Sequence, residues 1–229
     1  PGLDGKEVPA IDFIATMNTP REAEWNMWYH VLNCGFPVVA SGETDFPCMS
    51  GERVAMGRVY VQLEGKLDYE RWVRNLQLGK SYVSDGGAHL MNFERTDDGK
   101  FKVKAAAMIP DREEVPVELI VNGRPVETQS LKADGSTNEV MFSAPRLDRS
   151  SWVAVRIHPH AHTNPINVLI DGKPIRASRN SAQWCLAGVE QCWKEKSPSY
   201  APAELAQAKA DYDHARKVYQ KIIEESEVD

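Results

Sequence analysis

Between positions 101 and 175 the chain carries six short runs of strand-type residues, and this pattern constrains the fold more than any other. Turn-forming pairs separate several of the runs: Asn-Gly at 122–123 and Asp-Gly at 134–135 and 171–172. Short strands at near-regular spacing are typical of an antiparallel sandwich of immunoglobulin-like size, which we expect over residues 87–177. The runs are FKVKAAAMI, VPVELIVNG, RPVETQSL, NEVMFSA, SWVAVRIH and INVLIDGKPI.

The first 86 residues have a different pattern, in which strand and helix signals alternate. IDFIATMN at 11–18 and FPVVAS at 36–41 predict strands, and the residues between them predict a helix that Pro20 opens and Gly35 ends. Two further strands, separated by a helix that follows Asp68, continue the pattern. Strand, helix and strand with short connections predict a parallel sheet, although two or three such units cannot close a barrel.

Residues 178–229 predict a helical segment. Near its end, apolar residues recur in alternating steps of three and four, which is a heptad seam. Because the seam is shorter than three heptads, we expect it to pack on the chain's own body rather than in a two-chain coiled coil. The seam residues are Leu205, Ala208, Tyr212, Ala215, Tyr219 and Ile222.

The overall charge and the termini limit the possible partners. A net charge of -6 gives no electrostatic basis for binding nucleic acid or an anionic membrane. No apolar run approaches the roughly 20 residues that a membrane-spanning helix needs. The first residues, PGLDGKEVPA, contain neither a signal-peptide pattern nor an initiating methionine, so we expect a piece of a longer protein. The compartment stays open: we expect a soluble chain, with export as one alternative.

The four cysteines do not form a zinc motif. Cys34, Cys48, Cys185 and Cys192 include no CxxC pair, and buried thiols are the simplest interpretation. Cys185 and Cys192 would lie about 10 Å apart along one helix, which is too far for a disulfide between them. The sequence otherwise leaves the disulfide status of all four residues open.

One carboxylate stands out at the end of a predicted strand. In FPVVASGETD the apolar run ends in Gly42 and is followed by Asp45. Ligands gather beyond the carboxyl ends of parallel strands, and a carboxylate there needs a cation, an arginine or hydrogen-bond donors. Asp45 is therefore a candidate metal ligand, with a turn or capping acid as the alternative.

A second candidate site is the histidine run HPHAHTNP. His158, His160 and His162 alternate, so an extended chain would direct all three to one face, where they could share a metal ion. Pro159 and Pro165 mark the run as an irregular edge or loop. Histidines with a structural role are the alternative.

Taken together, four segments resemble a known family. WYHVLNCGFPVVASGETD, GRVYVQ, LDYERWVRNLQLGKSYVSDG and AHTNPINVLIDGKPI are similar, in this order over residues 11–175, to the C-terminal part of CehA/McbA-type metallohydrolases. These enzymes belong to the polymerase and histidinol phosphatase (PHP) superfamily. The resemblance implies that residues 1–86 are the last strands and helices of a distorted (β/α)7 barrel, followed by the β-sandwich (87–177) and the C-terminal helical segment (178–229).

The resemblance also implies a metal centre that this chain only partly supplies. Such a barrel holds two or three divalent ions (zinc, manganese or iron) that activate water for hydrolysis of phosphoesters, esters or carbamates. Asp45 matches the family's final-strand metal ligand, but Pro47 stands where many members have a histidine. The early HxH motif, the bridging glutamate and the middle-strand histidines have no counterparts here, so they are expected upstream of residue 1.

Three functions follow from these observations. The first is the C-terminal part of a metal-dependent hydrolase, inactive alone, whose partner is the missing N-terminal part of the barrel or a self-associating copy. The metal would then be bound in the full-length parent, with little or none in this chain. The second is a non-catalytic module that binds carbohydrate or protein through the sandwich. The third is a small hydrolase built on the three histidines with Asp45.

Overall fold

The computed structural model describes residues 11–17, 20–44 and 56–226. These residues belong to two compact units, each assembled from segments that are distant in sequence. The first unit comprises Pro1–Trp28, Val38–Arg146 and Val153–Asn167, and the second comprises Tyr29–Pro37, Leu147–Trp152 and Val168–Asp229.

A parallel pair of strands joined by a helix opens the first unit. β1 (Phe13–Ala15) and β2 (Val39–Ser41) pair in parallel, which confirms the prediction for this segment. The connecting helix α1 (Arg21–Asn33) begins directly after Pro20, whose fixed φ suits a first helical turn. The helix ends before Gly35, which has a φ of 87° that only glycine adopts without steric cost.

Two buried tryptophans hold the first half of α1 against this strand pair. The Trp25 indole donates a hydrogen bond to the carbonyl of Thr16, just beyond β1, at 3.0 Å. The Trp28 indole donates to the carbonyl of Val38, just before β2, at 2.8 Å. Each ring therefore buries its apolar surface while its single donor is satisfied by the backbone.

The (β/α)7 barrel expected for residues 1–86 is wrong. The described residues form a mixed α/β fold with three small sheets and no closed barrel. β3 (Arg58–Val61) and β4 (Ser81–Ser84) flank α2 (Tyr69–Gln77) but pair antiparallel. The physical reason is that β4 belongs to a different sheet from β1 and β2. In that sheet β4 also pairs antiparallel with β11 (Ala161–Thr163), and this pairing sets the direction of β4.

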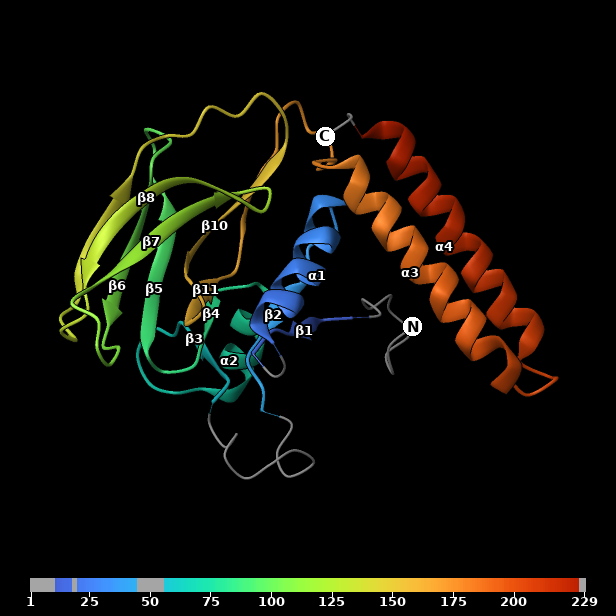
Figure 1. Cartoon of the computed structure of the whole chain (residues 1–229), viewed down its shortest axis with the longest axis horizontal. Helices are drawn as coiled ribbons and strands as arrows, with labels where there is room; N and C mark the ends of the chain where they lie inside the picture. The colour runs from blue at the N-terminus through green and yellow to red at the C-terminus, as the bar shows by residue number, and fades with distance from the viewer. Residues whose placement is uncertain (1–10, 18–19, 45–55, 227–229) are drawn as a thin grey trace. The chain divides into compact units, whose positions relative to one another are not determined.

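Two antiparallel sheets contain the remaining strands (Figure 1). The larger has the order β3-β4-β11-β10-β7-β8, with β12 paired to β10, and the smaller has the order β5-β6-β9. The strands that follow β4 are β5 (Ala88–Arg95), β6 (Phe101–Ala107), β7 (Glu114–Val121), β8 (Arg124–Lys132), β9 (Asn138–Phe142), β10 (Ser151–Ile157) and β12 (Ile166–Val168).

The core of the first unit lies between these two sheets. Over residues 101–105 of β6 and 114–119 of β7, buried residues alternate with more exposed ones, which is the period-two pattern of strands with one solvated face. Burial of this apolar area from both sheets is the main source of stability for the unit. The most deeply buried side chains include Leu90, Phe101, Val103, Val117, Leu119, Phe142 and Val155.

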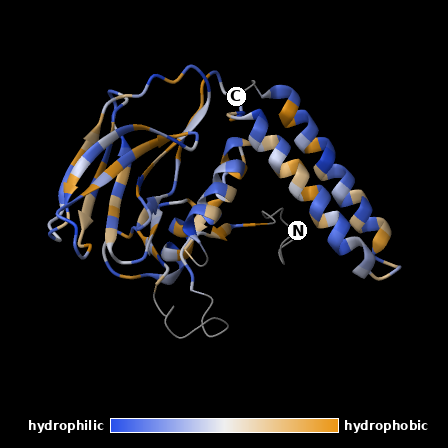
Figure 2. Cartoon of the chain, in the orientation of Figure 1, coloured by the Kyte–Doolittle hydropathy of each residue, from blue (hydrophilic) through white to orange (hydrophobic). Residues whose placement is uncertain are grey.

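In the second unit, α3 (Arg179–Lys196) and α4 (Leu205–Glu225) form a helical hairpin (Figure 1). Ser178 caps α3, because its hydroxyl accepts a hydrogen bond from the backbone of Ser181. The heptad seam of α4 packs on the chain's own α3, and Figure 2 shows hydrophilic and hydrophobic residues mixed along both helices. The core of the unit is a cluster of Cys34, Ala182, Cys185 and Ile222.

Candidate functional site

The carboxyl-end edge of the β1-β2 pair is where this fold would place a ligand. Both parallel strands end at that edge, and α1 begins there, with Arg21 as its first residue. The segment after β2 leaves from the same edge through Gly42 and Glu43. It leads to the predicted ligand Asp45, which lies outside the described residues.

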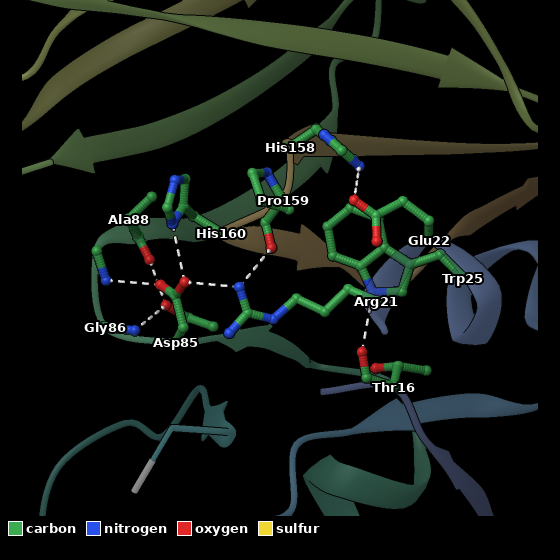
Figure 3. A network of polar contacts seen from close by, with 12 residues as sticks. Thr16, Arg21, Glu22, Trp25, Asp85, Gly86, Ala88, His158, Pro159 and His160 are labelled. Carbon is green, nitrogen blue, oxygen red and sulfur yellow. Dashed lines mark hydrogen bonds and ion pairs between the residues drawn. The ribbon is translucent and has the colours of Figure 1, made fainter. Parts of the chain in front are cut away.

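Asp85 is the centre of a polar cluster that includes Arg21 (Figure 3). One carboxylate oxygen of Asp85 accepts hydrogen bonds from Arg21 Nη1 at 2.9 Å and from His160 Nδ1 at 2.8 Å. The other oxygen accepts from the backbone N–H of Gly87 at 2.8 Å. The side chain of Asp85 is only 10% exposed, so its charge is compensated by these donors rather than by water.

Backbone contacts fix the two turns that carry this cluster. Asp85 follows the last residue of β4, and its own N–H donates to the carbonyl of His160 at 3.0 Å. Arg21 Nη1 also donates to the carbonyl of Pro159 at 3.3 Å. The start of α1, the β4-β5 turn and the β10-β11 turn are thus held together by one carboxylate and one guanidinium.

Glycines let the backbone and a second guanidinium approach this cluster. Gly86 has a φ of 93°, and a Cβ placed there would lie 2.4 Å from Arg58 Nη1. A Cβ on Gly42 would lie 2.2 Å from the backbone oxygen of Arg58. Arg58 therefore lies between the residue that follows β2 and the turn that carries Asp85. It is exposed, and no carboxylate among the described residues forms an ion pair with it.

The hydrogen bond to Asp85 determines what His160 can do. An ionised carboxylate only accepts hydrogen bonds, so Nδ1 of His160 carries a proton, and Nε2 is the ring nitrogen that is left to exchange a proton or bind a ligand. His160 is 25% exposed, so a bound molecule can approach its ring. A carboxylate-oriented imidazole of this kind can exchange a proton with a ligand or bind a metal ion.

A second histidine is held nearby by two stacked tyrosines. His89 Nδ1 lies 2.9 Å from the Tyr82 hydroxyl, and the rings of Tyr60 and Tyr82 stack with centroids 4.9 Å apart. Burial lowers the pKa of His89 below its ordinary value, the charge of Arg58 lowers it further, and Asp85 partly opposes the shift. His89 therefore stays neutral at physiological pH.

The three histidines of the HPHAHTNP run have three different surroundings. His158 Nε2 lies 3.5 Å from a carboxylate oxygen of Glu22, His160 contacts Asp85, and His162 is fully buried. The described residues contain no group of three or more His, Cys, Asp or Glu side chains that could hold a metal ion. The alternation in sequence does not bring the rings together because β11 belongs to a packed sheet and buries His162.

His162 is a core residue held between two indoles. Its ring lies edge-on to Trp25 and to Trp28, with centroids 5.0 Å away in each case. Its Nδ1 lies 2.7 Å from the carbonyl of Thr163. Burial is the main reason that the pKa of His162 falls to about 3, and the Thr163 carbonyl partly opposes this shift.

We predict that His162 makes the fold less stable in mild acid. The folded pKa of about 3 lies below the ordinary value of 6.5, so the unfolded chain binds more protons between these values and stability falls as pH falls below 6.5. From neutral pH to about pH 5 this group should lower the free energy of unfolding by about 2 kcal/mol. Urea unfolding at both pH values measures the difference.

The variant His162→Phe should reduce this pH dependence, because a phenyl ring has no site to protonate. His214→Gln, which changes an exposed histidine on α4, is the matched control and should leave the dependence as it is. An unchanged pH dependence in His162→Phe would contradict the prediction.

The described cysteines are free thiols. Cys34 and Cys185 are buried with their sulfur atoms 3.9 Å apart, and Cys192 is exposed. The hydrogen bond to Cys185 and burial raise the pKa of Cys34, so this thiol is unreactive as a nucleophile. Cys185 and Cys192 both lie on α3, as the sequence suggested, and Cys48 lies outside the described residues.

Sequence reasoning missed Asp85 and Arg21. The signal for Asp85 was of the same kind as that for Asp45, since the strand run KSYVS ends in an acid followed by two glycines. Arg21 carried no such signal, because an arginine in a first helical turn is ordinary. Only the packing of α1 against the β4-β5 turn gives it a role.

Comparison with known proteins does not identify a family for this chain. No family model, curated protein or solved structure matches this chain. In the part of the chain that the structure describes, none of the helices combines the length and apolar character required to span a membrane.

Proposed function

We propose that the chain is the C-terminal part of a metal-dependent hydrolase that cleaves phosphoester, ester or carbamate bonds. The motif resemblance over residues 11–175 supports this class of enzyme. The observation that carries the proposal is the cluster of Arg21, Asp85 and His160 at the carboxyl-end edge of the parallel pair, where the segment toward Asp45 also begins. An oriented imidazole, a compensated carboxylate and two guanidinium groups meet there.

The described residues do not make a metal site by themselves. They contain no cluster of three or more metal-binding side chains, and Asp85 already uses both carboxylate oxygens in hydrogen bonds. One carboxylate such as Asp45 is also insufficient. The remaining ligands would therefore come from residues outside the described part, and hydrolysis would require them.

Each residue of the cluster has a separate role in this proposal. Arg58 binds the anionic or carbonyl oxygen of the substrate, because its guanidinium is exposed and no described carboxylate pairs with it. His160 exchanges a proton with a substrate oxygen through Nε2. Asp85 and Arg21 are positioning residues that fix the ring of His160 and its tautomer.

The test is a hydrolysis assay on the 229-residue chain and on a longer polypeptide that contains it. Nitrophenyl phosphate, nitrophenyl acetate and naphthyl carbamate esters are the substrates, with zinc, manganese or iron added. We expect metal-dependent turnover from the longer polypeptide and none from the chain alone. In the longer polypeptide, His160→Ala should lower kcat by about 100-fold or more and remove one limb of the pH profile.

His158→Ala is the matched control, because this residue lies two positions away and contacts the surface carboxylate of Glu22 at 3.5 Å and the edge of the Trp25 ring, but neither Asp85 nor Arg21. It should leave kcat unchanged, and bound metal, measured by mass spectrometry, should be the same in both variants. Robust turnover by the 229 residues alone, or no turnover by the longer polypeptide with any of the metals, would refute the proposal.

A further inference from the structure

A second concave region lies between the two antiparallel sheets of the first unit, separate from the Asp85 cluster. It has a volume of about 640 Å³, which is within the range of pockets that hold small organic ligands. One wall comes from β3, β4 and the residues just before β4, and it includes Tyr60 and Lys80, while the other comes from β5 and β6 and includes Phe93 and Lys104. Arg21, Asp85 and His160 do not line it.

Each wall presents an aromatic ring that is held in place from behind. Tyr60 stacks on the buried ring of Tyr82 with an interplanar angle of 5°, and its hydroxyl accepts a hydrogen bond from Arg58. On the opposite wall, Phe93 stacks on the buried ring of Phe101. Tyr60 and Phe93 are both half-buried, so part of each ring is available to a ligand. Rigid rings of this kind bind the flat face of a sugar or another ring at low entropic cost.

The lining carries positive charge only. Lys80 and Lys104 are its charged residues, and no Asp or Glu contributes to it. Lys104 lies opposite Glu139 in the strand register, but among the described residues neither lysine forms an ion pair. The cleft is therefore suited to a ligand with a negative charge.

Uncommitted polar side chains complete the cleft. In the described part of the chain, the side chains of Gln62, Asn92 and Thr137 have no hydrogen-bond partner. Asn92 has a φ of 53° and lies where the β5-β6 register shifts between Met91 and Glu94. Asparagine tolerates this left-handed conformation, and bulges often redirect a side chain toward a binding site.

We infer that this cleft binds an acidic saccharide, a short chain of uronic acid units. A sugar ring stacks on Tyr60, carboxylates pair with Lys80 and Lys104, and hydroxyl groups bond to Asn92 and Thr137. The two lysines lie on opposite walls, so a ligand with more than one carboxylate satisfies both. A neutral sugar leaves both lysines unpaired, and a single carboxylic acid engages only one wall.

Isothermal titration of the 229-residue chain with trigalacturonate tests the inference. Galactotriose is the neutral comparison, and free galacturonate is the single-carboxylate comparison. We expect heat of binding for trigalacturonate, with both comparison ligands at least about 10-fold weaker. The double variant Lys80→Gln, Lys104→Gln should weaken trigalacturonate binding by about 10-fold or more, because it removes both ionic contacts.

Lys132→Gln is the matched control, since Lys132 is an exposed lysine on β8 that does not line this cleft, and it should leave the affinity for trigalacturonate unchanged.

Tyr60→Leu should also weaken binding of trigalacturonate, and circular dichroism checks that this variant is folded. The lysine variants alter exposed side chains, so they keep the test decisive if Tyr60→Leu does not fold. Equal affinity for galactotriose or galacturonate, equal loss in Lys132→Gln, or no binding by any ligand overturns the inference. His160→Ala should bind trigalacturonate normally, so the result is independent of the proposed hydrolase activity.

Discussion

Trp28→Ala is expected to lower the free energy of unfolding by about 4 kcal/mol, which is a large part of the stability of a domain of this size. The indole of Trp28 is fully buried and packs edge-on against His162. Truncation removes its apolar contacts, leaves a cavity, and deprives the Val38 carbonyl of its 2.8 Å hydrogen bond. Urea unfolding followed by circular dichroism measures the loss.

Two further variants separate the contributions to this loss. Trp28→Phe keeps much of the ring volume but loses the donor, so it should cost about half as much as Trp28→Ala. Trp184→Ala removes an indole on α3 that is 45% exposed, and its cost should stay below about 1 kcal/mol. Equal losses for Trp28→Ala and Trp184→Ala would show that the packing of α1 on the strand pair is not what stabilises the fold.

Asp85→Ala should cost about 3 kcal/mol, because it leaves Arg21 and His160 without their shared acceptor. The side chains of Asp85 and Arg21 are 10% and 19% exposed, so water compensates only part of the loss. Asp85→Asn keeps the shape and one oxygen acceptor, and it should fall between Asp85→Ala and the wild type. The measurement is again the free energy of unfolding in urea.

A double-mutant cycle with Arg21→Met tests whether the ion pair is responsible. The double variant should cost less than the sum of the two single variants by about 1–3 kcal/mol, because each single change leaves one charge unpaired. Asp98→Ala is the control, since Asp98 is 57% exposed and pairs with Lys100 on the surface. It should leave the unfolding midpoint unchanged. Additive costs in the cycle would mean that Asp85 acts through its backbone turn alone.

The sequence by itself determined the local elements of this protein. Pro20 and Gly35 mark the two ends of a helix. The residues on either side of it, 11–18 and 36–41, contain β1 and β2. These predictions succeeded because the helix starts and stops depend on residues only a few positions away. The same holds for β6 to β10 and β12, with Asn-Gly and Asp-Gly pairs in two of the turns between them, whereas no predicted run covers β5 or β11.

Only the tertiary structure decided which strands share a sheet and which side chains meet. The sequence pattern of β3, α2 and β4 is the same as that of β1, α1 and β2. Yet β3 and β4 pair antiparallel, whereas β1 and β2 pair in parallel. The direction of β4 is set by its pairing with β11. In that pairing Ser84 lies opposite Ala161, which is 77 positions later in the sequence. The residues next to β4 in the sequence do not predict such a long-range pairing.

The candidate site shows the same limit. His160 was singled out for its spacing from two other histidines, but its partner is Asp85, 75 positions away in sequence. His162, equal to it in the pattern, is a neutral core residue because β11 buries it. Residue types and their spacing predict which groups could react, whereas burial and long-range contacts decide which of them are placed to do so.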